Sequence, residues 1–566
     1  MNQSPTRAMT SAIIFALSIT LLMSCSVETT QTSDVVQPSA QLSSRILTQA
    51  TFGPTSEEIS RLQNMGTAAW FNDQFSKPKT LHFSYVNQAQ STLAPDQSPD
   101  ENMFLESFWR QAITGDDQLR QRVTYALSQI LVISFQNDTL ADMPRGVAHY
   151  YDTLATHAFG NYRDLLQAVS LHPTMGIYLS ALKNQKTVGA RVPDENYARE
   201  IMQLFTIGLR KLNVDGTDTT NPATPTYNND DIKGLAKVFT GWSWAGPDKN
   251  SNRFMGYDNP KPDPNRDWLP MQNYPDYHEA VYDAAPAIPK SVLLSDTVNG
   301  AIIPQNTSGE DSLKIALDKL FNHPNVGPFI GRQLIQRMVT SNPSPAYIGR
   351  VAAAFNNNGQ GVRGDMKAVI KAILLDDEAK DPSIKPSYIA NNNGKLREPV
   401  LRLANWMRAF HVSSASGNFK LPNTDDPLRA LSQTPMRSPS VFNFFRPEYQ
   451  PPNTSITTAN LNAPEMQITE ETSVFGYLDY MRNAIPSGIG TGREIKADYT
   501  VELSLSKSPD LLIDRIKLLL LQDNMSASLR SQILAAVSSN SNISAANKVY
   551  LAIFLTMASP EYLAQK

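Results

Sequence analysis

Apolar residues recur at helical spacing through most of this chain, and this periodicity limits the folds that the chain can adopt. Within residues 104–135, for example, Leu119, Val123, Leu127 and Leu131 fall on one helical face. No segment shows the alternation of apolar and polar residues that marks a half-buried strand, and no repeat of fixed period is present. The pattern therefore predicts a mainly α-helical protein.

The expected helices are interrupted by two regions that are rich in Pro, Asp, Asn and Gly, near residues 245–310 and 411–470. Three amphipathic helices are expected to close the chain, near residues 508–522, 526–538 and 544–558. We thus expect a large multi-helix globular body with two long loop-rich insertions.

The first 25 residues have the pattern of a bacterial lipoprotein signal. The apolar run from residue 8 to residue 23 is too short and too rich in Ser and Thr for a membrane-spanning helix, but it suits a secretory signal peptide. Leu22-Met23-Ser24-Cys25 then matches a lipobox, in which Cys25 is lipidated and becomes the mature N-terminus. Ser26, where Asp would favour retention in the inner membrane, favours export to the outer membrane of a Gram-negative cell. The alternative is an ordinary signal peptide with an incidental cysteine.

This signal sets the expected organisation of the 566 residues. Residues 1–24 are predicted to be the signal peptide, and residues 25–41, rich in Ser and Thr, a flexible tether. Residues 42–566 are predicted to be the helical domain, as one body or as two lobes at 42–310 and 311–566, because a chain of this length exceeds one small core.

Composition and motifs exclude several classes of function. The net charge of −3 gives no general attraction to nucleic acid. A single cysteine rules out an internal disulfide, a CxxC motif and a c-type haem attachment. The chain has no Walker loop, GxSxG or HExxH motif. Its seven histidines are at least eight residues apart, so a metal site would have to combine distant segments. The sequence identifies no cofactor and no metal.

The most distinctive stretch begins at Pro193 and reads as two packed helices joined by a polar loop. Asp194 is expected to cap the first helix, on which Asn196, Arg199, Glu200 and Gln203 share one polar face. As a catalytic site, Glu200 would be a general acid or base and Arg199 an anion clamp. If the same face has only a structural role, it is either solvated or part of a buried ion-pair network. Further catalytic candidates are Glu195, Asp231 and His172.

Other residues are candidates for ligand binding, each with a structural alternative. Trp242 is a sugar-stacking platform or a core residue. His278 is a candidate ligand. His323, which precedes Pro324, is either a ligand or a helix cap. Seven residues would form a basic pocket for a carboxylate, a phosphate or a sulfated sugar, or else structural salt bridges: Arg332, Arg337, Lys395, Arg397, Glu398, Arg437 and Arg446.

Several long motifs resemble the bacterial family called domain of unknown function 1800. They are ILTQATFGPT (46–55), HAFGNYRDLL and LHPTMGIYL (157–179), ENYAREIMQLFTIGL (195–209), AKVFTGW (236–242), residues 320–355, KLREPVLR (395–402) and RSPSVFNFFRPEY (437–449). The resemblance implies an exported, mainly helical protein. It also suggests a partner, because relatives are often encoded beside a second exported family, domain of unknown function 1501, which is similar to sulfatases. Many relatives carry a segment similar to FWHNHF, whereas the corresponding RVTYALSQILVISFQN has no histidine here.

Two functions from different classes follow. The first is a surface binding or assembly protein that acts with an exported partner. The second is an exported hydrolase that uses a carboxylate and arginine site on polysaccharide or ester substrates. The hydrolase requires that carboxylates and histidines meet in one concave pocket, and this requirement separates the two functions. The carboxylates are Glu195, Glu200 and Asp231, and the histidines are His172, His278 and His323.

Overall fold

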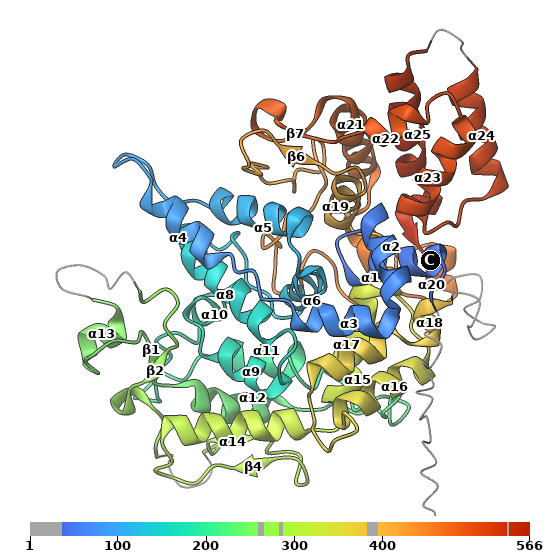
Figure 1. Ribbon diagram of the computed structural model, residues 1–566. Coiled ribbons are helices and arrows are strands. Elements are labelled where there is room, and N and C mark those ends of the chain that lie inside the picture. The colour runs from blue at the N-terminus through green and yellow to red at the C-terminus, as the bar shows by residue number, and fades with distance from the viewer. Residues whose placement is uncertain (1–36, 258–264, 282–286, 382–393, 540–542) are drawn as a thin grey trace, which may run out of the picture. The chain divides into compact units, whose positions relative to one another are not determined.

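The computed structural model describes residues 37–257, 265–281, 287–381, 394–539 and 543–566 (Figure 1). Cys25, the signal peptide and most of the tether lie outside the described residues. Over the described ranges the protein is mainly helical, which confirms the predicted fold class. None of the helices in this part of the chain has the length and apolarity that crossing a bilayer requires.

The helices of the first half precede and surround the central segment. They are α1 (Ala40–Ala50), α2 (Ser56–Met65), α3 (Thr67–Ser76), α4 (Phe83–Ser91), α5 (Asn102–Thr114), α6 (Gln118–Ser128), α7 (Asp138–Ala141), α8 (Pro144–His157), α9 (Tyr162–Ser170), α10 (Pro173–Tyr178), α11 (Asn196–Gln203), α12 (Asn229–Ala236) and α13 (Ser251–Met255).

The second half continues in the same style. Its helices are α14 (Gly309–Asn322), α15 (Val326–Met338), α16 (Pro345–Asn356), α17 (Met366–Leu374), α18 (Asp377–Lys380), α19 (Pro399–Ala409), α20 (Ser455–Thr458), α21 (Glu471–Ser487), α22 (Thr500–Ser504), α23 (Pro509–Leu521), α24 (Ala527–Ser538), α25 (Ala545–Ala558) and α26 (Pro560–Leu563). The last three long helices, α23 to α25, lie where the periodicity predicts them.

Strands are confined to two-residue antiparallel pairs in the described chain. The pairs are β1 (Trp242–Ser243) with β2 (Gln272–Asn273), β3 (Ser291–Val292) with β4 (Ala301–Ile302), β5 (Lys395–Leu396) with β8 (Ala564–Gln565), and β6 (Ser413–Ser414) with β7 (Ile495–Lys496). Two of these pairs lie within residues 245–310 or at its edge, where short elements interrupt a long irregular segment as expected.

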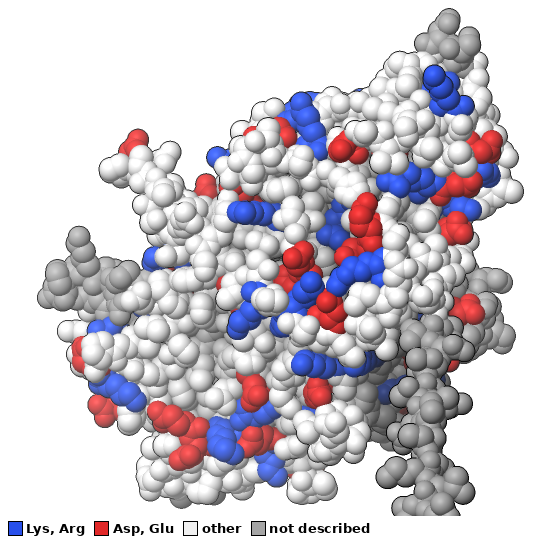
Figure 2. Space-filling view, viewed as in Figure 1, with Lys and Arg blue, Asp and Glu red and all other residues white. Residues whose placement is uncertain are grey.

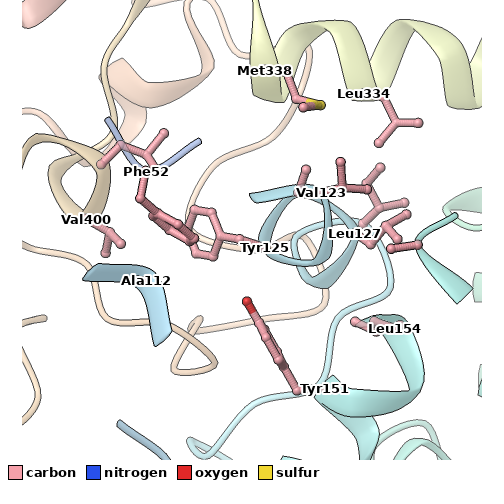
Figure 3. Close-up of a cluster of buried hydrophobic side chains, with 14 of the residues drawn as sticks. Phe52, Ala112, Val123, Tyr125, Leu127, Tyr151, Leu154, Leu334, Met338 and Val400 are labelled. Carbon is pink, nitrogen blue, oxygen red and sulfur yellow. The ribbon is translucent and has the colours of Figure 1, made fainter. Parts of the chain in front are cut away.

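The core is organised around α6 and α19, because every residue of these two helices is buried. Aromatic and aliphatic side chains from α5, α6, α8 and α15 meet there, among them Tyr125, Leu127, Leu154 and Met338 (Figure 3). Six residues of α6 are nevertheless polar, so this buried helix carries groups that need hydrogen-bond partners inside the protein.

Buried arginines are accommodated in this core because they bind backbone carbonyl groups. Arg337 donates to the carbonyls of Gln129, the C-cap of α6, at 2.9 Å and of Gln333 at 3.1 Å. Arg408 donates to those of Gly53 at 2.7 Å and Ile113 at 2.9 Å. A cation is favoured beside the carbonyl end of a helix, so these guanidinium groups join helix ends across the core.

The central pair of helices differs from the sequence prediction at the start of its first helix. Helix α11 begins at Asn196 with Glu195 as its N-cap, so the prediction that Asp194 is the cap is wrong. Asp194 lies one residue earlier, where its carboxylate accepts the backbone N–H of Asn196 at 2.8 Å. The second helix, α12, ends at Ala236, and a short 3₁₀ turn over Lys237–Phe239 follows it.

Residues 37–566 form one compact unit. Helices from both sides of residue 310 pack against each other in it, including α6 with α15 and α5 with α19. The division into two lobes stays a prediction.

Candidate functional site

A cavity of about 720 Å³ lies between α8, α9, the start of α4 and the segment around Trp268. We call it the His149 cavity. Five residues of α8 line it: His149, Asp152, Thr153, Thr156 and His157. These positions follow one another at spacings of three, one, three and one, so they share a single helical face. The volume is in the range of small-molecule sites in proteins.

His172 reaches the same cavity from the start of α10. It is the N-cap of that helix, with Pro173 at the first helical position, where a missing backbone N–H does no harm. This local arrangement buries the imidazole and holds it in place, since only 3% of His172 is exposed.

His172 and His149 are hydrogen-bonded to each other. The distance from Nε2 of His172 to Nδ1 of His149 is 3.0 Å, and the ring centres are 5.3 Å apart. Nδ1 of His172 lies 2.8 Å from the hydroxyl of Thr174 and 3.3 Å from its backbone nitrogen. No hydrogen bond to Nε2 of His149 is formed within the described residues, and His149 lines the cavity.

Burial keeps the histidines of the cavity neutral. It lowers the pKa of His172 well below its ordinary value, and the neighbouring His149 lowers it further. Burial also lowers the pKa of His149 and of His157. Neutral imidazoles both donate and accept hydrogen bonds, so these side chains can bind the hydroxyl groups of a ligand.

Asp152 is the buried carboxyl group of the cavity, and its oxygens are already engaged. They accept the backbone N–H groups of His82 at 2.7 Å and Phe83 at 2.8 Å, and so fix the start of α4. Burial nevertheless raises the pKa of Asp152 to about 7. Its main role is to position α4, which carries part of the cavity wall.

Aromatic side chains form one side of the cavity. The rings of Phe83 and Trp268 are 4.7 Å apart at 62°, and the Phe83 ring lies edge-on to His149 at 5.6 Å. Arg145 stacks on Trp268, with its guanidinium carbon 4.7 Å from the ring centre. The cavity thus combines an apolar, flat wall with polar side chains.

The comparisons with known proteins give one result that bears on this chain. The family model described as "Protein of unknown function (DUF1800)" matches residues 45–564. The chain belongs to this family. No curated protein and no solved structure matches it.

In this DUF1800 protein, His172 is the single predicted catalytic candidate among the residues that line the His149 cavity. The polar face of α11 lies elsewhere. Arg199 and Glu195 form a partly exposed ion pair of 3.5 Å, and Asn196 is exposed. Gln203 accepts a hydrogen bond from the hydroxyl of Tyr227 at 3.2 Å.

Glu200, on that same face, is 6% exposed, and burial raises its pKa. Its Oε2 atom has no hydrogen-bond partner among the described residues. The polar face of α11 is thus neither fully solvated nor part of the cavity.

Asp231 has a structural role in this protein. Its carboxylate completes a capping box with Asn228 at the start of α12, and it also accepts the N–H of Ser295 at 2.8 Å. Trp242 is 5% exposed, and its indole N–H donates to the carbonyl of Val238 at 3.3 Å, so it packs in the core.

The other two histidine candidates are buried away from the cavity. Nε2 of His278 lies 3.1 Å from the amino group of Lys290, which is itself fully buried, and burial lowers the pKa of His278 to about 4. His323 accepts the backbone N–H of Asn325 at 3.1 Å, and its Nε2 lies 3.9 Å from Asp296. Both join loop segments to helices.

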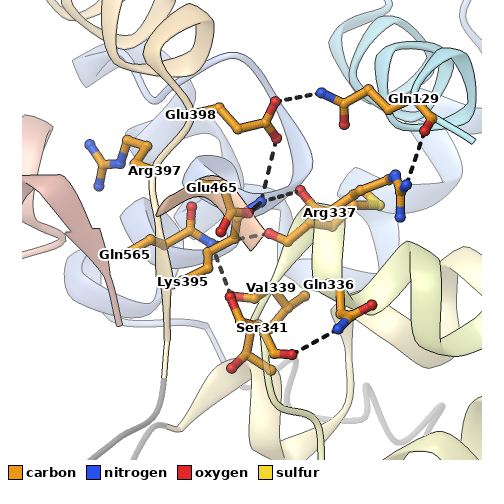
Figure 4. A network of polar contacts seen from close by, with 12 residues as sticks. Gln129, Gln336, Arg337, Val339, Ser341, Lys395, Arg397, Glu398, Glu465 and Gln565 are labelled. Carbon is orange, nitrogen blue, oxygen red and sulfur yellow. Dashed lines mark hydrogen bonds and ion pairs between the residues drawn. The ribbon is translucent and has the colours of Figure 1, made fainter. Parts of the chain in front are cut away.

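The charged residues of the KLREP motif lie inside the protein (Figure 4). Glu398 is fully buried and accepts hydrogen bonds from Gln129, Gln433 and Tyr125. Lys395 lies between two buried carboxylates, 3.5 Å from Glu398 and 3.1 Å from Glu465. This is a network that joins α6, α19 and the segment before α21.

The remaining arginine candidates are engaged in separate contacts. Arg397 points away from the Glu398 network in Figure 4 and donates to Asn405 at 3.0 Å. Arg437 binds Glu101 and Asp425. Burial lowers the pKa of Arg332 on α15. None of the predicted basic-pocket residues lines the His149 cavity.

Sequence reasoning missed His149, His157 and Trp268. The first two are eight residues apart, which separates them along the chain but places them on one face of a helix. Trp268 comes from an insertion without periodicity. Over the described ranges, no group of three or more His, Cys, Asp or Glu side chains is arranged to hold a metal ion.

Proposed function

We propose that this DUF1800 protein is a lipid-anchored envelope protein that binds a neutral, hydroxyl-rich ligand of the saccharide class in the His149 cavity. The observation that carries this proposal is the composition of the cavity: an aromatic wall faces side chains that form hydrogen bonds without net charge. Flat aromatic side chains pack against the apolar faces of sugar rings, while hydroxyl groups need both donors and acceptors.

The distribution of charge supports a neutral ligand. Lys79 is the one Lys or Arg among the lining residues, and it is exposed, with its amino group 3.1 Å from the hydroxyl of Thr156. Asp164 is also exposed, and the oxygens of Asp152 are bound to backbone N–H groups. Deeper polar contacts come from Thr153 and the neutral histidines. Charges of both signs are interspersed on the face of the protein shown in Figure 2.

The envelope part of the proposal is supported by residues 22–25, which match a lipobox. Cleavage before Cys25 and lipidation of its thiol would anchor the mature protein at a membrane surface. Ser26 supports the outer membrane as its location.

Ligand binding is tested by saturation-transfer difference NMR on the purified full-length lipoprotein, with cellobiose, maltose and chitobiose as probes. We expect a signal from at least one disaccharide with the wild type. Ala168→Trp, which places an indole in the cavity from α9, should abolish that signal. Ala536→Trp is the matched control, because Ala536 is an equally half-buried alanine on α24, outside the lining.

Each outcome decides a part of the proposal. The absence of signal from all three disaccharides would contradict the saccharide ligand. A signal that survives in Ala168→Trp would show that binding takes place outside the His149 cavity.

A further inference from the structure

One backbone N–H group sets the proton positions of the histidine pair in the His149 cavity. As the N-cap of α10, His172 accepts the backbone N–H of Thr174 at its Nδ1 atom, at 3.3 Å. A backbone N–H can only donate, so the proton of the neutral His172 ring lies on Nε2. This Nε2–H group donates to Nδ1 of His149, 3.0 Å away. The proton of the neutral His149 ring therefore also lies on Nε2.

His149 thus presents an N–H group to the cavity. The residue is half-buried and lines the cavity, and its Nε2 forms no hydrogen bond within the described residues. A second proton on Nδ1 of His149 would face the Nε2–H group of His172. This contact and burial, which lowers the pKa of His149, both disfavour the charged ring. A ligand group that binds Nε2 of His149 must therefore be an acceptor.

Thr153 supplies the complementary group one turn further along α8. Its hydroxyl donates to the backbone carbonyl of His149 at 2.9 Å, a bond that threonine often forms in a helix. Because this bond uses the hydroxyl proton, the oxygen offers lone pairs to the cavity that Thr153 lines. Residues four apart lie on the same helical face. The cavity therefore holds an N–H donor and an oxygen acceptor on neighbouring turns of α8.

Apolar side chains complete the surroundings of these two groups. The ring of Phe83 lies edge-on to His149, with the ring centres 5.6 Å apart. Leu81, Ala168 and Leu171 also line the cavity, and all three are partly buried. A ligand group that suits this environment carries one acceptor, one donor and a small apolar end.

We propose that the ligand of the His149 cavity is a 2-acetamido sugar, whose acetamido carbonyl accepts the Nε2–H group of His149 and whose amide N–H donates to Thr153. The acetamido methyl group packs against the apolar lining. The inference rests on the proposed function, because it names the saccharide that the cavity binds. His149 and Thr153 are then the residues that determine specificity, and His172 positions the N–H group of His149.

A carboxylate and a hydroxyl group suit the two positions less well. The carboxylate of a uronic acid would accept from His149 but would place a second acceptor beside the oxygen of Thr153. It would also need a cation, and Lys79, the one Lys or Arg among the lining residues, is exposed and bound to the hydroxyl of Thr156 at 3.1 Å. A hydroxyl group has no apolar end to fill the lining.

The test compares two disaccharides with the same linkage. N,N′-diacetylchitobiose carries an acetamido group at the position of each ring where cellobiose carries a hydroxyl group. Dissociation constants are measured by saturation-transfer difference NMR titration of the purified full-length lipoprotein. Diacetylchitobiose should bind about 10- to 50-fold more tightly, which is the gain expected from one hydrogen bond and one buried methyl group. Its acetyl methyl protons should receive the strongest saturation.

Substitutions locate this preference at the proposed atoms. His149→Phe removes the N–H group and should reduce the preference to about threefold or less. His149→Gln should retain more of it, because its side-chain amide can accept from His172 and donate to the ligand. Thr153→Val removes the acceptor oxygen and should weaken the binding of diacetylchitobiose more than that of cellobiose.

Two variants outside the cavity are the matched controls, and both should bind as the wild type does. His411→Phe changes a partly exposed histidine that does not line the cavity. Thr48→Val changes a half-buried threonine of α1 whose hydroxyl donates to the carbonyl four residues earlier at 2.8 Å, as that of Thr153 does.

Two measurements on the wild type decide the inference even if the variants do not fold. Long-range correlation of proton and nitrogen resonances, in protein labelled at its histidines, reports which ring nitrogen carries the proton. The histidine that shifts on addition of diacetylchitobiose should carry it on Nε2. A shifting ring with its proton on Nδ1, or weak saturation of the acetyl methyl group, would overturn the inference.

The comparison of disaccharides separates this inference from the proposed function. Cellobiose or maltose that binds as tightly as diacetylchitobiose would overturn the acetamido ligand and leave saccharide binding standing. An unchanged preference in folded His149→Phe would overturn the role of His149. The absence of signal from every disaccharide would contradict both proposals.

Discussion

Burial, more than the presence of opposite charges, sets the behaviour of the ionisable side chains at the His149 cavity. The histidines are held neutral because their rings are removed from water, with lowered pKa values. Burial has the opposite effect on Asp152, because it raises the pKa of this carboxyl group. Desolvation disfavours the charged form of each group, so it lowers the pKa of a base and raises that of an acid.

Asp152 should make stability depend on pH. Its pKa in the folded protein, about 7, is above its ordinary value of 3.8, so its contribution to stability is complete at low pH and is lost as the pH rises through about 7. The free energy of unfolding of the wild type should therefore fall, relative to that of Asp152→Asn, between about pH 4 and pH 7. Urea denaturation across this range measures the difference, with Asp164→Asn as a control for removing a charge at the cavity. A constant difference would contradict the prediction.

The buried Lys395 should be essential for stability. Lys395→Met leaves Glu398 and Glu465 in the interior without their shared cation, which should cost about 3–5 kcal/mol. Guanidinium denaturation measures this loss. Lys314→Met is the control, because Lys314 forms an exposed pair with Asp318 at 2.7 Å, and its removal should cost about 1 kcal/mol or less. A similar loss in the two variants would refute the role of burial.

The same site offers a double-substitution test. Lys395→Met combined with Glu465→Gln removes the cation together with one carboxylate, so the double variant should be less destabilised than the sum of the single variants. Additive losses would show that the two side chains do not interact.

At the scale of elements, one helix builds most of the cavity. Helix α8 supplies five lining residues from one face, while its other residues, such as Tyr150 and Leu154, pack in the core. The positions of His172 and of α4 relative to α8 then depend on contacts between elements: the cap of α10 and the hydrogen bonds from α4 to Asp152.

In helix α12, by contrast, a carboxylate that the sequence suggested as catalytic stabilises the start of the helix. Asp231→Ala removes the capping box of α12 and the bonds to Ser295, which should destabilise the protein by about 2–4 kcal/mol. Asp230→Ala, an exposed neighbour in the same turn, should change stability by less than about 1 kcal/mol. Thermal denaturation measures both. Disaccharide binding by folded Asp231→Ala should equal that of the wild type, and its loss would place Asp231 in the binding site.

At the scale of the whole molecule, the predicted anchor depends on one thiol. Cys25→Ser should abolish incorporation of labelled palmitate and leave the signal peptide uncleaved, because lipidation precedes cleavage at a lipobox. Ser26→Asp, which keeps Cys25, should still be labelled but should fractionate with the inner membrane. Metabolic labelling and membrane fractionation measure both. Palmitate incorporation in Cys25→Ser would contradict the anchor.

The sequence by itself determined the helical class, the positions of α23 to α25, the family and the irregular insertions. These are local properties, because the spacing of apolar residues and the turn residues act within a few turns of chain. It also indicated His172, which marks a helix boundary before Pro173.

Only the tertiary structure decided which polar residues meet. His149 and His172 are 23 residues apart, Lys395 and Glu465 70 apart, and Asp231 and Ser295 64 apart, and no spacing rule connects them. Whether a carboxylate caps a helix, balances a buried amine or faces a ligand depends on the elements packed around it. For this reason the sequence drew attention to the polar face of α11, whereas the fold formed its cavity on α8.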